Sequence, residues 1–153
     1  MSLSENVINH IEENSLKVLG CLLLVVGMIV YFDFLTFHKF FIAEDIASDQ
    51  LRYYLPRYVF QADRFWSGNF SNWSFQFGLG QNIYDIVFNL NIFDRLLILF
   101  GRDGLLFALP YITVLKHITA GLLFFIYLRL LKISPYSAII GSLLLAYSGF
   151  MVV

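Results

Sequence analysis

The sequence predicts an all-α, polytopic membrane protein: transmembrane helices, with interfacial helices in a long first extracytoplasmic loop. Of its 153 residues, 59% are hydrophobic and 14% are charged, whereas a soluble domain is about 45–50% apolar and about 25% charged. The aromatic fraction of 18% is typical of chains that lie at membrane–water interfaces. The net charge of −1 gives no reason to expect a nucleic-acid partner.

The first predicted elements are a polar segment and a membrane-spanning helix. Residues 1–15 are polar and lack the basic start of a signal peptide, so they are predicted to form a cytoplasmic N-terminal segment. Residues 16–35 are predicted to form transmembrane helix 1, because about 20 mostly apolar residues cross a hydrocarbon core of about 30 Å. The single cysteine, Cys21, falls within this run, so no disulfide framework or cysteine-based zinc site can form within one chain.

Residues 36–104 are predicted to form the extracytoplasmic loop. They are too polar to cross the bilayer and too aromatic for an unstructured linker. The run EDIASDQLRYYLPRYVFQADRFWSGN mixes apolar and charged residues like a helix lying on a membrane surface, interrupted near Pro56. The next run, SGNFSNWSFQFGLGQN, is rich in turn residues, and its glycines favour turns over a ligand-binding loop. A second interfacial or re-entrant helix is predicted in DIVFNLNIFDRLLILFG.

Two further membrane segments follow the loop. Residues 105–131 are predicted to form transmembrane helix 2, residues 132–136 a cytoplasmic turn, and residues 137–153 the start of transmembrane helix 3. Because the chain stops inside that third segment, it is expected to be the N-terminal piece of a longer protein. The basic residues around the turn, together with Lys17, place the N-terminus in the cytoplasm by the positive-inside rule.

Three carboxylates follow transmembrane helix 1 closely: Glu44, Asp45 and Asp49. Asp45 and Asp49 are four residues apart, so they would share one face of a helix and repel each other. Such a pair can bind a metal, hold a cationic partner, or give one carboxylate a raised pKa and the role of general base. The alternative is a helix start, where acidic residues stabilise the helix dipole.

Two ionisable residues lie inside predicted transmembrane helix 2. Lys116 is about 18 Å along its axis, and an ionisable group at that depth indicates a functional site unless it snorkels to the interface or pairs with an acid. The adjacent His117 is interpreted as a structural histidine whose hydrogen bonds are satisfied. With no HxxH spacing, a zinc site is not predicted.

Four stretches resemble, in order, the N-terminal part of the YfhO family of bacterial polytopic membrane proteins. The resemblance runs from about Glu44 to Val153, through DIASDQLRYYLPRYVF, SGNFSNWSFQFGLGQNIY, LKHITAGLLFFIYLRLLKIS and AYSGFMVV. The more specific features are the aspartate-containing stretch before Y-x-P, the W-x-F-x-x-G-x-G-x-N loop, and the lysine in the next membrane helix. The resemblance implies a multi-pass protein of the bacterial cytoplasmic membrane.

Proteins of this family resemble C-type glycosyltransferases, which take a polyprenyl-phosphate sugar as donor on the outer membrane face. The resemblance implies that the first external loop carries the catalytic base, a role that falls to Asp45 or Asp49. Arg52, Arg57 and Lys116 would stabilise the charge on the departing lipid phosphate. No metal site is predicted, and the cofactor stays open, because the acidic pair is also compatible with a divalent cation.

The leading functional prediction is therefore a membrane glycosyltransferase that transfers a hexosyl or N-acetylhexosaminyl group to a cell-envelope glycopolymer or glycolipid. Its expected partners are membrane lipid, the polyprenyl-phosphate sugar donor and that acceptor. The alternative is a non-enzymatic transporter or flippase for a lipid-linked precursor, in which Lys116 and the acids bind the headgroup. A structural membrane subunit without chemistry is the third candidate.

Overall fold

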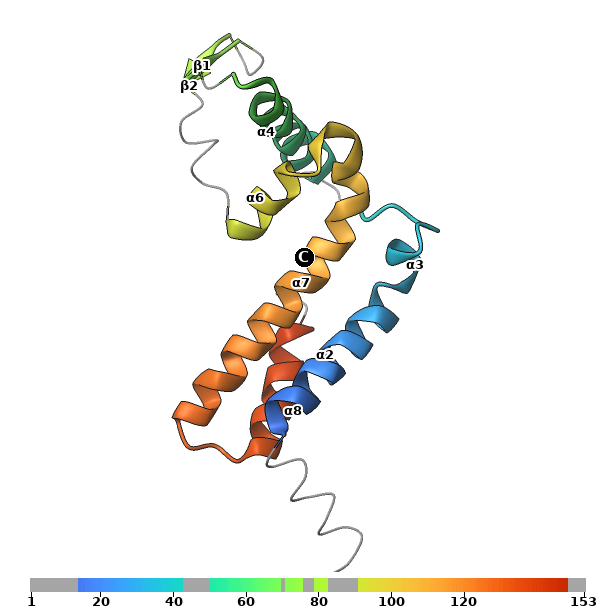
Figure 1. Cartoon of the computed structure of the whole chain (residues 1–153), viewed down its shortest axis with the longest axis vertical. Coiled ribbons are helices and arrows are strands. Elements are labelled where there is room, and N and C mark those ends of the chain that lie inside the picture. Colours follow the sequence, from blue (N-terminus) through green and yellow to red (C-terminus); the bar gives the residue numbers. More distant parts are fainter. Residues whose placement is uncertain (1–13, 43–49, 70, 76–78, 83–90, 149–153) are drawn as a thin grey trace, which may run out of the picture. The chain divides into compact units, whose positions relative to one another are not determined.

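The computed structural model confirms that the chain is mostly helical. It describes residues 14–42, 50–69, 71–75, 79–82 and 91–148. These residues form six α-helices, one π-helical turn and one pair of short strands (Figure 1). The chain divides into two compact units, which are described separately: Met1–Leu35 with Thr113–Val153, and Thr36–Ile112.

The first unit is a helical bundle. Helix α2 (Ser15–Val30), helix α8 (Pro135–Ala146) and the second half of α7 lie side by side in Figure 1. After α2, a single helical turn, α3 (Phe32–Leu35), follows Tyr31. The apolar sequence of these helices leaves each with a face to bury, and the faces meet in a core formed by Leu19, Leu23, Phe125, Ala138, Ile139 and Ala146.

Helix α7 (Gly101–Leu130) has 30 residues and is the one helix within the described residues that is long and apolar enough to cross a membrane. At 1.5 Å per residue it extends about 45 Å, against a hydrocarbon core of about 30 Å. It overlaps the predicted span 105–131, and α2 and α8 overlap the predicted spans 16–35 and 137–153. Those two helices are apolar but shorter, so their crossing of the bilayer stays a prediction.

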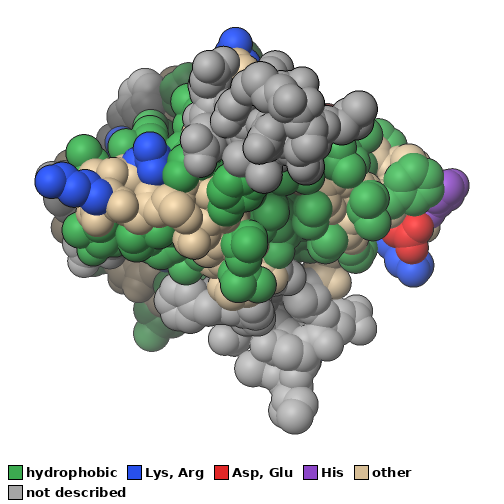
Figure 2. All heavy atoms as spheres, turned by 90° about the horizontal axis from the view of Figure 1, so that it is seen from below, with side chains coloured by type: hydrophobic (Ala, Val, Ile, Leu, Met, Phe, Trp, Pro, Cys, Tyr) green, Lys and Arg blue, Asp and Glu red, His purple; other side chains and the backbone are tan. Residues whose placement is uncertain are grey.

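The surface of the described residues is largely hydrophobic on the face drawn in Figure 2, where basic side chains gather at the margins. Leu24, Met28 and Ile29 of α2 and Leu144 of α8 are among the large apolar side chains that stay exposed. Exposed apolar stripes of this kind are costly in water and favourable in lipid, in agreement with a membrane protein.

Two glycines let the helices of the bundle approach closely. A Cβ atom added at Gly121 of α7 would lie 2.8 Å from both terminal carbons of Leu23, a fully buried side chain of α2. A Cβ atom at Gly27 would lie 2.8 Å from the hydroxyl oxygen of Tyr147. Small residues at such contacts are common between membrane helices, where close van der Waals packing stabilises association.

Replacing Gly121 with alanine is expected to destabilise the bundle by about 1–3 kcal/mol, because the new methyl group overlaps Leu23 and the core must shift. Gly20 is the matched control, since a Cβ atom there meets nothing within 4 Å. Gly20→Ala should stabilise by about 0.4–1 kcal/mol, as glycine-to-alanine changes do in unobstructed helices. The midpoint of unfolding in a denaturing-detergent titration measures both changes, and an equal gain from the two variants would contradict the packing at Gly121.

In the second unit, two helical segments follow the acidic stretch 43–49 in the sequence. A π-helical turn, η1 (Gln50–Tyr54), leads into helix α4 (Leu55–Ser67), with Pro56 in its first turn, where a proline costs no hydrogen bond. The predicted interruption near Pro56 therefore corresponds to the start of α4. The helix ends at Gly68, which has a φ of 67° in the left-handed region that glycine adopts freely.

The glycine-rich loop contains two short antiparallel strands that were not predicted from the sequence, β1 (Trp73–Ser74) and β2 (Gln81–Asn82). Gly80 precedes β2 with a φ of 104°, and a Cβ atom there would lie 2.8 Å from the Phe75 ring. The predicted turn role is thereby confirmed for Gly80, since only a residue without a side chain fits.

Helix α6 (Ile92–Ile98) completes the second unit together with the first part of α7. The Asn91 side chain caps it by accepting a hydrogen bond from the Asp94 backbone at 2.9 Å. The Trp66 indole of α4 donates to the Ile98 carbonyl at 3.3 Å, which ties α4 to the end of α6. A hydrophobic core cluster of this unit is formed by the buried residues Leu97, Ala108 and Leu109, with Phe41, Tyr58 and Ile112 packed against them.

Half-exposed aromatic rings gather around the start of α7. Phe37 packs edge-on against Phe107, with ring centroids 5.3 Å apart, and also contacts the Tyr111 ring. The Phe40 ring packs edge-on against Phe107 as well, with centroids 6.1 Å apart. These four rings keep roughly half of their surface exposed. Aromatic side chains of this kind are enriched at the headgroup level of membranes.

Candidate functional site

The predicted catalytic carboxylates lie outside the described residues. Glu44, Asp45 and Asp49 all fall in the stretch 43–49, which ends immediately before η1. The assignment of the base to Asp45 or Asp49 therefore stays a prediction.

The two predicted arginines follow in η1 and α4. The Arg52 side chain is exposed. The Arg57 guanidinium lies 5.8 Å from the centre of the Tyr53 ring, and its Nη1 donates to the Tyr53 hydroxyl at 3.4 Å. A cation over an aromatic face is stabilised by the ring quadrupole. Tyr53 therefore orients Arg57 at the start of α4, directly after the predicted acidic pair in the sequence.

A partly buried tyrosine, Tyr58, joins α4 to α6. Burial raises the pKa of the Tyr58 phenol, and the charge of Asp94 and the hydrogen bond to that carboxylate raise the pKa further. Tyr58 thus stays neutral and donates to Asp94. Tyr58 and Asp94 are 36 positions apart in the sequence, so no local pattern predicts the hydrogen bond between them. Its effect is to hold the two short helices of the loop in a fixed arrangement.

Lys116 lies in the first unit, in the middle of α7. Its side chain is partly buried, and within the described part of the chain no hydrogen bond or ion pair engages its ammonium group. It stands about 22 Å from the first residue of the helix at 1.5 Å per residue. Lys116 and the two arginines belong to different units, and the predicted phosphate site stays a prediction.

The prediction that His117 is a satisfied structural histidine is confirmed. Its side chain is fully buried, Nδ1 lies 2.6 Å from the Thr113 carbonyl oxygen, and Nε2 lies 3.3 Å from the Tyr31 hydroxyl. A carbonyl only accepts, so Nδ1 carries the proton, and in the neutral ring Nε2 accepts from Tyr31. The imidazole also stacks on the Tyr147 ring, 5.5 Å away with an interplanar angle of 15°.

The same cluster connects all three helices of the bundle. Tyr31 follows α2, His117 lies on α7, and Tyr147 follows α8. The Tyr147 hydroxyl donates to the Leu23 carbonyl of α2. Buried polar groups are costly in an apolar environment unless they are paired. The packing of each helix is therefore stabilised by a hydrogen bond that another helix of the bundle completes.

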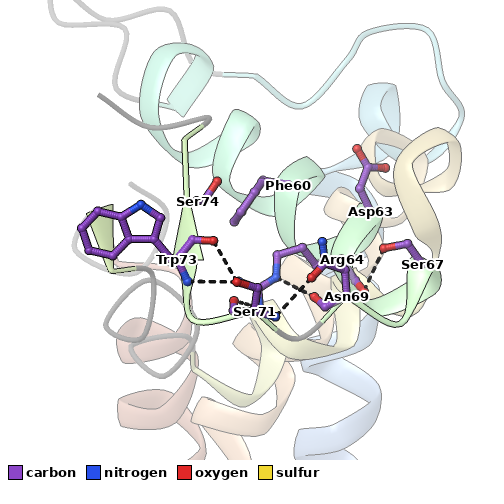
Figure 3. A pocket seen from close by; sticks show the side chains of 8 residues that line it. All are labelled: Phe60, Asp63, Arg64, Ser67, Asn69, Ser71, Trp73 and Ser74. Atoms are coloured by element: carbon purple, nitrogen blue, oxygen red, sulfur yellow. Dashed lines mark hydrogen bonds between the residues drawn. The ribbon is translucent and has the colours of Figure 1, made fainter. Parts of the chain in front are cut away.

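A polar pocket lies where α4 meets β1, in the second unit. Its volume is about 220 Å³. Figure 3 shows the lining side chains and the hydrogen bonds among them. They combine an acid, a base, an amide, three hydroxyls and two aromatic rings: Phe60, Asp63, Arg64, Ser67, Asn69, Ser71, Trp73 and Ser74.

Arg64 organises this pocket. Its Nε donates to the Asn69 carbonyl at 3.0 Å and its Nη2 donates to the Ser71 carbonyl, so the guanidinium holds the chain that leaves α4. The group also lies 5.6 Å from the centre of the Phe60 ring. Burial lowers the pKa of Arg64, but an arginine stays charged in proteins. Arg64 is thus primarily a scaffold for the loop that forms the pocket wall.

Asp63 stands beside Arg64 on the exposed side of α4. One of its oxygens, Oδ2, pairs with Arg102 of α7 at 3.3 Å, and both side chains are largely exposed. An exposed pair of this kind contributes about 0–1 kcal/mol. One sequence signal accompanies this pocket, the polar run SGNFSNWS directly after an amphipathic helix. Because that run is typical of turns, it does not by itself predict a pocket.

Among the described residues, no group of three or more His, Cys, Asp and Glu side chains converges to hold a metal ion. The acidic stretch 43–49 lies outside the described residues.

Comparison with known proteins points to one family. The family model described as bacterial membrane protein YfhO matches residues 18–153, which is nearly the whole chain. No curated protein and no solved structure matches.

Proposed function

Because this chain belongs to the YfhO family of bacterial membrane proteins, we propose that it is an integral membrane glycosyltransferase. It transfers a sugar from a polyprenyl-phosphate donor to a cell-envelope glycopolymer or glycolipid on the outer face of the cytoplasmic membrane. In this proposal the N-terminus is cytoplasmic and the unit Thr36–Ile112 is the extracytoplasmic loop.

The observation that carries the proposal is Lys116. An ammonium group in the middle of an apolar helix costs several kcal/mol unless an anion compensates it, and no acid among the described residues does so. In this proposal the phosphate group of the bound lipid donor is the compensating anion. A transient phosphate ligand accounts for a charged lysine in the helix.

The reaction assigns a separate task to each group. The acceptor hydroxyl oxygen attacks the anomeric carbon and forms the new glycosidic bond, while the bond from that carbon to the phosphate oxygen breaks. The hydroxyl proton passes to the carboxylate of Asp45 or Asp49. The lipid phosphate leaves with the bonding electron pair, and the positive charges of Lys116, Arg52 and Arg57 stabilise the charge that develops there.

The test is transfer itself. Membranes that contain the full-length protein are supplied with a radiolabelled polyprenyl-phosphate sugar, and label is followed into the glycopolymer and glycolipid fractions. The proposal expects label in one of those fractions, above membranes without the protein. Intact labelled donor that merely changes leaflet would contradict it and would identify the transporter alternative.

A further inference from the structure

The pocket between α4 and β1 is of a size for one small polar unit. Its volume of about 220 Å³ is below the roughly 300–1,000 Å³ of sites for drug-sized ligands. Its lining divides between apolar rings and polar groups, with Phe60 almost fully buried as its apolar wall. A ligand that fits must therefore present both C–H surface and hydrogen-bonding groups within a small volume, as a sugar ring does.

The polar wall of the pocket is fixed before any ligand arrives. Arg64 binds the carbonyls of Asn69 and Ser71. The Asn69 Oδ1 accepts from the Ser71 backbone at 3.2 Å, and the Ser71 hydroxyl donates to the Trp73 carbonyl at 3.1 Å. Figure 3 shows this chain of hydrogen bonds along the wall. Preorganised groups bind a ligand with a smaller loss of entropy.

Several hydrogen-bonding positions remain for a ligand. The salt bridge to Arg102 uses Oδ2 of Asp63 and leaves Oδ1 as an acceptor. The Asn69 side chain uses its oxygen and leaves its NH₂ group as a donor. The lining thus includes a carboxylate acceptor and an amide donor, both of which can bind ligand hydroxyl groups, since a hydroxyl group both donates and accepts.

The charge balance of the pocket favours a neutral ligand. The lining holds one carboxylate, Asp63, and one guanidinium, Arg64. Two of the donor groups of Arg64 are already engaged by backbone carbonyls. The third nitrogen, Nη1, is buried and has no hydrogen-bond partner among the described residues. An anion in the pocket would therefore meet the carboxylate of Asp63 without an exposed arginine fork to offset it.

We propose that this pocket binds one neutral sugar ring of the acceptor glycan. The assignment of that ring to the acceptor rests on the proposed function, whereas the binding of a sugar ring rests on the pocket alone. Phe60 supplies the apolar wall, and Asp63 and Asn69 bind the ring hydroxyls. The pocket is then a positioning site that presents the glycan to the reaction.

The experiment measures sugar binding without any donor. The full-length protein, in a detergent without a sugar headgroup, is titrated with methyl glucoside and methyl N-acetylglucosaminide, and binding is followed by saturation-transfer NMR. The parent protein should bind at least one glycoside. Asp63→Ala should weaken that binding about tenfold or more, since it removes hydrogen bonds to a charged acceptor.

Arg102→Ala is the matched control, because it breaks the same salt bridge but does not line the pocket. It should bind like the parent. Equal binding by the parent and Asp63→Ala, or displacement of the glycoside by inorganic phosphate, would contradict sugar binding in this pocket. Glycoside binding without sugar transfer in membranes would support sugar binding in the pocket and contradict the proposed function, so the two failures are distinguishable.

Discussion

Replacing Asp45 or Asp49 with asparagine should lower sugar transfer by at least roughly 10²-fold at one of the two positions, the usual scale for a lost acid–base group. Asparagine keeps the volume and most of the hydrogen bonding of aspartate but cannot accept the proton. Because a base acts in the transition state, turnover should fall far more than donor affinity. The other aspartate should have a smaller effect, through positioning or through a metal.

Glu44→Gln is the control for this pair, since on a helix Glu44 would point about 100° away from Asp45. It should change transfer little. All three variants are compared at equal abundance in the membrane, by transfer rate and by donor affinity. A helix-start role predicts three similar losses of about 1 kcal/mol or less in stability, with activity intact. A turnover equal to that of the parent protein in both aspartate variants would contradict the assignment of Asp45 or Asp49 as the catalytic base.

The second large effect is expected at Lys116. Lys116→Met keeps the length and apolar stem of the side chain and removes the charge, so transfer should fall by about 10²–10³-fold if the ammonium stabilises the leaving phosphate. Lys116→Arg should keep part of the activity, because the charge survives while its geometry changes. Transfer at saturating donor and the donor KM are measured for both variants.

Lys17→Met is the matched control, because Lys17 is an exposed lysine near the start of α2. It should transfer like the parent. The Lys116 variants must also insert and accumulate normally, which quantitative immunoblotting of membranes measures. Normal transfer by Lys116→Met would make Lys116 a snorkelling residue and withdraw the main support for the proposed function.

Local sequence patterns predicted the helical elements well, because their causes are local. Apolar length predicted α7, which continues through Pro110, and the preference of proline for a first helical turn predicted the interruption at Pro56. The structural role of His117 was also predicted, although its partners were not. The exact start of α7, at Gly101 rather than residue 105, depends on a left-handed glycine that hydropathy does not report.

Features made by distant residues were not predicted. The bond between Tyr31 and His117 joins positions 86 residues apart, and the bond from Tyr147 to Leu23 joins positions 124 apart. The pocket between α4 and β1 depends on Arg64 turning back onto the loop that follows its own helix, which no spacing rule specifies. Turn-forming residues such as Asn69 and Ser71 look alike in the sequence whether they close a turn or line a site.

The tyrosine–histidine cluster also imposes an order on how the bundle is made. Tyr31 is synthesised long before His117, and Leu23 long before Tyr147. Until His117 is synthesised, the Tyr31 hydroxyl lacks that partner and must form its hydrogen bonds elsewhere. The contacts that α8 makes with α2 can form only after α7 has been synthesised. Completion of the bundle is therefore a late event of biogenesis, and a chain arrested before Tyr147 would lack the bond that ties α8 to α2.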